Sequence, residues 1–210
     1  MGGFDNAKMV KINNKEVESI KTNDGGIIYQ RPMIATIIGD EIYLGHDNSQ
    51  WLIANGDVKV DFGTGRQYTI DTTKQIYFGY TNQGDGLSSH DITFFGIITG
   101  LGEGCFEDCT SLTNIIIPLS VTSLGKYCFS GCTSLTSVTI PSSVTTLGNY
   151  CFYRCSSLNT YQLYWTSNNI IAYDSNKMLN NTNTKFYVPK GQKTNYVNKG
   201  YPSAKVIERS

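Results

Sequence analysis

The sequence is short of charge and of histidine. Charged side chains make up 16% of its 210 residues, 17 basic residues balance 17 acidic ones, and only two residues are histidine. A surface for nucleic acid or anionic lipid needs a basic excess, so no nucleic-acid partner is expected. No apolar run approaches the roughly 18 residues of a membrane helix, so no membrane insertion is expected either.

The motifs of common catalytic sites are also missing. The sequence contains no nucleophile elbow, P-loop, paired-histidine motif or Rossmann glycine pattern. Gly100, Gly102 and Gly104 belong to the start of a repeat, and His90 followed by Asp91 indicates a polar strand entry. The sequence therefore predicts no catalytic residue, no cofactor and no metal site, and we expect a protein that is not an enzyme.

A secretory signal is not visible in the first ten residues, MGGFDNAKMV, which lack a basic stretch followed by an apolar one. We expect either a protein that is released without such a signal, as virion proteins are, or one whose export signal has been removed. The first alternative predicts a virion location, and the second predicts an extracellular or cell-surface location.

Proline is scarce too, with 5 residues, whereas glycine (21), tyrosine (14) and β-branched residues are common, which favours a mainly β fold. Residues 1–100 show no amphipathic pattern of helix length and contain short β runs instead. Turn signals separate these runs at Asn13-Asn14, Asp24-Gly25-Gly26, Gly39-Asp40 and Asn55-Gly56. This half of the chain is therefore predicted to be a β meander or a β-sandwich.

The second half of the chain repeats at an offset of 23 residues without a gap, over residues 101–123, 124–146 and 147–165. Each unit contains Leu-x-x-hydrophobic-x-hydrophobic, which predicts a strand whose alternate side chains point inward. Ile92 and Phe94 align with the first such strand, so a half repeat is expected from about residue 90. One phenylalanine and one leucine of each unit are predicted to fill the coil: Phe106, Phe129, Phe152, Leu112, Leu135 and Leu158.

All six cysteines lie inside the repeats, in one column of Cys105, Cys128 and Cys151 and another of Cys109, Cys132 and Cys155. The Cys-x-x-x-Cys spacing and the scarcity of histidine argue against zinc. Buried free thiols that act as small apolar side chains are the favoured interpretation. Disulfides between neighbouring units are the alternative, although side chains in register point the same way, which is poor geometry for a bridge.

These units resemble the BspA-like leucine-rich-repeat family, whose repeats read roughly IG-x-x-AF-x-x-C-x-SL-x-x-V-x-IP-x-SV. The resemblance covers about residues 90–165, and a C-terminal ending of the family type extends it to about residue 208. Cysteine at positions 105, 128 and 151 departs from the alanine that is usual in the family. The resemblance implies a short solenoid with a C-terminal cap, in a surface or adhesion protein that is not an enzyme.

Two shorter resemblances concern the N-terminal half. The segment VKVDFGTGRQYTI, followed by TNQGDGLSSHDITFFG, resembles a PKD-like β-sandwich, with Asp61, Gly63 and Gly65 in its turn and Thr64 in place of the usual Asp. One carboxylate cannot build a calcium site, so a turn-capping Asp is expected. Residues 10–30 resemble a β motif that begins many phage structural proteins and serves for attachment; a plain β meander is the alternative.

The outward face of the repeat strands is the candidate binding surface. Between the inward positions lie small polar residues, and two aromatic residues follow the last repeat strand. Exposed aromatic rings beside small polar groups favour contact with a glycan or a protein. The alternative is that the aromatic residues close the solenoid against its cap. The candidate ligand-binding residues are Asn114, Ile116, Ser137, Thr139, Thr160, Gln162, Tyr164 and Trp165.

The sequence thus predicts a mainly β chain in four parts: an N-terminal β motif that serves as an anchor (1–31), a PKD-like β-sandwich (32–96), the solenoid (97–165) and a C-terminal cap (166–210). The predicted function is that of a phage fibre or decoration component that displays the repeats for host attachment. Its expected partners are other virion proteins, a second copy of itself, and a host-surface protein or glycan. The alternative is a bacterial or archaeal cell-surface adhesin module.

Overall fold

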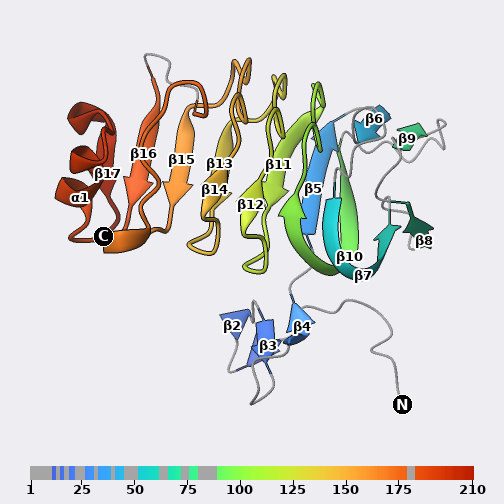
Figure 1. The fold of residues 1–210 in the computed structure, drawn as a ribbon. Helices are drawn as coiled ribbons and strands as arrows, with labels where there is room; N and C mark the ends of the chain where they lie inside the picture. Colours follow the sequence, from blue (N-terminus) through green and yellow to red (C-terminus); the bar gives the residue numbers. More distant parts are fainter. Residues whose placement is uncertain are drawn as a thin grey trace.

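The fold is shown in Figure 1 as a computed structural model of the chain. The residues that the structure describes are 11–12, 15–16, 19–21, 27–30, 33–38, 41–44, 52–61, 66–71, 76–79, 89–178 and 183–210. The predicted turns at Asn13-Asn14, Asp24-Gly25-Gly26 and Gly39-Asp40 lie outside these residues, as do Gly63, Thr64 and Gly65 of the PKD-like turn.

The described part of the chain is mainly β and contains one α-helix, so the prediction of a mainly β chain is confirmed. In chain order its elements are β1 (Lys11–Ile12), β2 (Lys15–Glu16), β3 (Ser19–Lys21), β4 (Ile27–Gln30), β5 (Met33–Ile38), β6 (Glu41–Leu44), β7 (Leu52–Asp61), β8 (Gln67–Ile70), β9 (Ile76–Gly79), β10 (Ser89–Leu101), β11 (Leu112–Ile116), β12 (Ser123–Leu124), β13 (Ser137–Ile140), β14 (Thr146–Leu147), β15 (Thr160–Leu163), η1 (Ser167–Asn169), β16 (Lys185–Val188), α1 (Lys193–Asn198), η2 (Ser203–Lys205) and β17 (Val206–Glu208).

The repeat strands pair in parallel at the offset of the sequence repeat. Ser137 of β13 lies opposite Thr160 of β15, and Ser123 of β12 lies opposite Thr146 of β14, each 23 residues further along the chain. The strand β15 then pairs in parallel with β16, and β16 with β17, so β13, β15, β16 and β17 follow one another across one sheet (Figure 1). Because the offset equals one unit, equivalent side chains stack on one another.

The stacked phenylalanines form the centre of the core. The rings of Phe106 and Phe129 lie 5.4 Å apart at an interplanar angle of 3°, and those of Phe129 and Phe152 lie 5.3 Å apart at 4°. Phe94 meets Phe106 edge-on at the N-terminal end of this column, and Tyr161 meets Phe152 edge-on at the other end. All six residues that the sequence assigns to the coil interior are fully buried.

The turn between Leu-Gly and the next strand imposes two conformational demands on each unit. The equivalent residues Gly104, Tyr127 and Tyr150 all have positive φ, and a second such column consists of Asp108, Gly131 and Arg154. Gly125 and Gly148, which follow the second and third repeat leucines, meet a different demand, because a Cβ on either would collide with the backbone of the preceding unit. The turn of each unit therefore contains two residues with positive φ, and glycine after the leucine allows neighbouring units to approach closely.

The strand β5 lies between the half repeat and the first full repeat. It pairs antiparallel with β10 on one side and with β11 on the other, so β10 and β11 are not neighbours. Ile92 and Phe94 are buried, as inward residues of the half repeat should be, but β5 separates their strand from β11. Pairing over such sequence distances leaves no local signal, so the alignment could not reveal the inserted strand.

The strand β10 connects the two halves of the chain. Its first part pairs with β5 and its later part with β7, while Gly100 and Leu101 at its end pair in parallel with β12. It therefore crosses residues 96–97, where the sequence predicts a domain boundary, without an intervening linker. The described strands β5, β7, β8 and β10 share one sheet and β6 pairs separately with β9, so the PKD-like sandwich stays a prediction.

The turn predicted at Asn55-Gly56 is wrong, because β7 runs through this position without reversing. The register between β7 and β10 shifts there, from Lys59 opposite Phe95 to Asn55 opposite Ile97. Gly56 has φ +88°, which is the conformation that lets a strand bulge and bend. Asn55-Gly56 therefore marks a β-bulge in β7 and not a turn, since glycine inside a strand often occupies a bulge.

The cap consists of a strand, a short helix and a last strand, which are β16, α1 and β17. In Figure 1 the helix α1 lies at the end of the row of strands, beyond β17. An aromatic cluster fills the space beneath it, with Trp165, Phe186, Tyr196 and Tyr201 all buried. The indole Nε1–H of Trp165 donates to the Val144 carbonyl oxygen at 2.6 Å, and this bond ties the last repeat unit to the unit before it.

The six cysteines are free and buried. The thiol of Cys132 donates to the Phe106 carbonyl oxygen at 3.1 Å, and the thiol of Cys155 donates to the equivalent carbonyl oxygen of Phe129 at 2.9 Å. Burial raises the pKa of all six thiols, to about 12 for Cys155. These side chains therefore stay protonated near neutral pH and act as packing groups.

Candidate binding face

The register of the parallel strands arranges the outward side chains in rows. Thr139, Gln162, Tyr187 and Ile207 are paired in succession across β13, β15, β16 and β17. Neighbouring residues in such a row lie about 4.8 Å apart along the sheet. The outer face therefore changes from small and polar over the repeats to larger side chains over the cap.

Seven of the eight candidate binding residues reach the surface of this face. Asn114, Thr139 and Tyr164 are exposed, and Ile116, Ser137, Thr160 and Gln162 are partly exposed. The exception is Trp165, which is fully buried, so its assignment to the binding face is wrong.

The position of Trp165 is outward in the earlier units, where the equivalent residues Leu119 and Ser142 are exposed. In the last unit the chain leaves the coil after β15 and enters η1, and this change of path turns Trp165 under the cap. The hydroxyl of Tyr196 in α1 donates to the Trp165 carbonyl oxygen at 3.0 Å and holds the segment there. For Trp165 the alternative interpretation, closure of the repeats against the cap, is the right one.

An apolar groove of about 450 Å³ lies on the candidate face between β11 and β13. Among the described strands, β11 pairs with β5 and β13 pairs with β15, and no strand pairing joins β11 to β13. The sheet is thus interrupted at the groove. Its lining includes four of the predicted binding residues and consists of Asn114, Ile115, Ile116, Ile117, Leu119, Thr139, Pro141, Ser142 and Tyr164.

Two exposed apolar side chains border the apolar groove. Leu119 is 46% exposed and Tyr164 is 47% exposed, which makes them two of the large hydrophobic residues that the described surface leaves open. The guanidinium of Arg209 lies over the Tyr164 ring at 3.7 Å from its centroid and donates to the Leu163 carbonyl oxygen at 2.7 Å. Tyr164 is therefore held in place at the rim by Arg209, the residue that follows the last strand of the cap.

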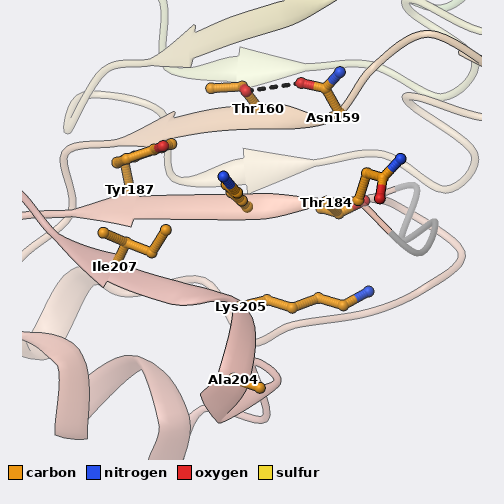
Figure 2. Close-up of a pocket in the computed structure, with 9 residues that line it drawn as sticks. Asn159, Thr160, Thr184, Tyr187, Ala204, Lys205 and Ile207 are labelled. Atoms are coloured by element: carbon orange, nitrogen blue, oxygen red, sulfur yellow. Dashed lines mark hydrogen bonds between the residues drawn. The ribbon is translucent and has the colours of Figure 1, made fainter.

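A second depression, of about 460 Å³, lies over β15, β16 and β17 and is named the basic pocket (Figure 2). Figure 2 shows Tyr187 and Ile207 at one end of it, and Thr184 and the ammonium group of Lys205 toward the other. The hydroxyl of Thr160 donates to the side-chain oxygen of Asn159 at 2.8 Å. The lining consists of Asn159, Thr160, Asn183, Thr184, Lys185, Tyr187, Ala204, Lys205 and Ile207.

Of the residues that line the basic pocket, the repeat pattern predicts only Thr160 as a binding residue. The 23-residue offset ends at residue 165, so the alignment gives no register for the cap strands that supply Lys185, Tyr187 and Ile207. A signal was nevertheless present, because the cap holds a local excess of lysine in a chain that is neutral as a whole.

The described residues contain no group of three or more His, Cys, Asp or Glu side chains that could hold a metal ion. In that same part of the chain no helix has the length and apolar character needed to cross a membrane. The two depressions on this face are lined by hydroxyl and amide groups, apolar side chains and lysine ammonium groups.

Comparison with known protein families identifies the family of the repeats. The family model of the BspA type leucine rich repeat region (6 copies) matches residues 85–198, which is more than half of the chain. The chain therefore belongs to the BspA-type leucine-rich-repeat family, and the resemblance seen in the repeat sequence is confirmed. The curated proteins and the solved structures gave no match.

Proposed function

We propose that the chain is a non-enzymatic binding protein that attaches to a surface protein of a host through the apolar groove. Membership of the BspA-type family supports a protein-binding or adhesive role. The observation that carries the proposal is the groove itself, where Leu119 and Tyr164 are left exposed beside the partly exposed Ile116. An exposed apolar patch with a polar surround is typical of a protein contact.

The biological setting that we propose is a phage particle, with the chain as a fibre or decoration component. The resemblance of residues 10–30 to the first β motif of phage structural proteins supports this setting, and residues 1–31 would be the anchor. The second candidate is a cell-surface adhesin module, which the family membership favours equally. Mass spectrometry of purified particles separates the two, because only the first setting requires the chain to be a particle component.

The groove is tested by binding of the fluorescently labelled full chain to intact host cells. The variants Leu119→Asp and Tyr164→Ala change the rim of the apolar groove without entering the core. We expect each to weaken binding at least tenfold, since loss of an apolar interface anchor costs about 2 kcal/mol or more. Digestion of the cell surface with a protease is expected to abolish binding.

Tyr153→Ala is the matched control, because Tyr153 is 46% exposed but lies in the turn of its unit, away from the outward strand face. It should leave binding within twofold of the unmodified chain. Binding that survives both groove variants unchanged would rule out the groove as the contact surface.

A further inference from the structure

The C-terminal cap concentrates positive charge. Over residues 183–210 there are six basic side chains and one acidic side chain, a formal charge of +5, whereas the whole chain has a net charge of zero. Such a local excess attracts anions toward one end of a neutral molecule. The basic residues are Lys185, Lys190, Lys193, Lys199, Lys205 and Arg209.

Two of these side chains line the basic pocket, one from β16 and one from the end of η2. Lys185 begins β16, and Lys205 directly precedes Val206, which pairs with Phe186, the residue after Lys185. Adjacent strands are about 4.8 Å apart, so Lys185 and Lys205 occupy neighbouring positions where β16 and β17 begin. No Asp or Glu is among the lining residues of the pocket.

The rest of the lining is suited to a sugar ring rather than to a bare anion. Tyr187 and Ile207 are paired in register and partly exposed, and they offer a flat apolar surface at one end of the pocket. Hydroxyl and amide groups of Thr160, Asn159 and Asn183 surround the remainder. Sites for small ligands combine an apolar surface with a few polar groups in this way, and a volume of about 460 Å³ lies in their usual range.

We propose that the basic pocket binds an acidic sugar residue of a surface glycan. The anionic group of the sugar lies against Lys185 and Lys205, the apolar face of its ring lies on Tyr187, and its hydroxyl groups meet Asn159 and Thr160. The site is separate from the apolar groove in its residues and in the class of its ligand, so it goes beyond the proposed protein contact.

The test is titration of the full chain with small sugars, followed by calorimetry or NMR. The acidic probes are sialyllactose and digalacturonate, which carry a carboxylate, and lactose sulfate, which carries a sulfate; lactose is the neutral probe. We expect at least one acidic probe to bind at least tenfold more tightly than lactose, and the stronger acidic probe identifies the anionic group. Raising the salt concentration should weaken this binding, because the lysines are solvent-accessible.

Paired variants separate the pocket from the general charge of the cap. Lys185→Gln combined with Lys205→Gln removes both pocket ammonium groups, and we expect it to weaken acidic-sugar binding at least tenfold. Lys190→Gln combined with Lys199→Gln removes the same charge from exposed cap positions outside the pocket lining. This second pair should change the affinity less than twofold, and Tyr187→Ala should weaken binding several-fold.

Equal losses in the two double variants, or equal binding of lactose and every acidic probe, would overturn the proposal. The proposal would also be overturned if none of the acidic probes bound to the full chain in its folded state. Tyr164→Ala is expected to leave sugar affinity unchanged, so failure of the protein contact and failure of the sugar site give different results.

Discussion

At the scale of single residues, the repeat turn places some side chains in a conformation that favours glycine. The equivalent positions 108, 131 and 154 all have positive φ, and the middle unit has Gly131 there while the last unit has Arg154, with φ +58°. A Cβ in this region of the Ramachandran plot costs about 1–2 kcal/mol, whereas glycine adopts it freely. The last unit therefore carries local strain that the middle unit avoids.

Arg154→Gly is expected to stabilise the protein by about 0.5–1 kcal/mol, because relief of the strain exceeds the greater flexibility of glycine in the unfolded chain. Arg154 is exposed, so the change opens no cavity. The measurement is the midpoint of urea unfolding. Arg154→Ala keeps the Cβ and should give no such gain, and identical midpoints for the two variants would show that the strain is absent.

The buried thiols make stability depend on pH in the alkaline range. Burial raises the pKa of Cys128, Cys132 and Cys151 well above the value of 9.0 that a free thiol has, and that of Cys155 to about 12. Between pH 9 and 12 the unfolded chain loses thiol protons that the folded chain keeps. Stability is therefore full below about pH 9 and falls as the pH rises through that range.

We expect each such thiol to contribute a loss of about 1.4 kcal/mol per pH unit above pH 9. Urea unfolding at pH 7, 9 and 10.5 measures the decline. Cys128→Ala, which places the usual residue of the family in that column, should make it shallower by the share of one thiol. A free energy of unfolding that stays constant up to pH 10.5 would show that the thiols are not buried in the folded state.

At the scale of elements, the cap is part of the hydrophobic core, because it buries side chains of the last repeat. The side chains of Tyr161 and Trp165 belong to the last repeat but are buried against cap residues, with Phe186 stacked on Tyr161 at 5.2 Å. The strand β16 also covers the edge of β15, whose backbone groups would otherwise be unpaired. An open end of a repeat stack exposes both core and edge, so a terminal cap is required for solubility.

A chain truncated after residue 182 should therefore lose its sharp thermal transition and aggregate on heating. Differential scanning calorimetry with light scattering detects both effects. Tyr196→Phe is the mild comparison, because it keeps the buried ring and removes only the hydrogen bond to Trp165, at a cost of about 1–2 kcal/mol. A truncated chain that melts as sharply as the full one, at the same temperature, would contradict the role of the cap.

At the scale of the whole molecule, the repeats could be predicted from the sequence because their information is local and is stated three times. Phe106, Phe129 and Phe152 recur at an offset of 23 residues, and parallel pairing of successive units at that offset stacks their rings on one another. The insertion of β5 between β10 and β11 could not be predicted in this way, because it depends on pairing across more than 50 residues. An apolar strand such as Met33–Ile38 does not reveal its partners.

The residues of the candidate site also differ in whether local sequence information predicts them. The groove residues Ile116 and Thr139 lie inside the periodic region, where alternation tells which side chains face outward. Trp165 lies two residues beyond β15, the last repeat strand, and there the change of chain path, not the alternation, decides which side chain is buried. Lys185 and Lys205 lie further still, so only the three-dimensional pairing of β16 and β17 brings them to one pocket.

The parallel register gives the molecule an adjustable length. Each 23-residue unit pairs with the next without a shift, as Ser137 does with Thr160. Gain or loss of one whole unit would therefore move the basic pocket by about 4.8 Å relative to β5 and would leave the chemistry of both ends intact. Copying or deleting one 23-residue segment would therefore change the distance between the two ends of the solenoid without altering the side chains at either end.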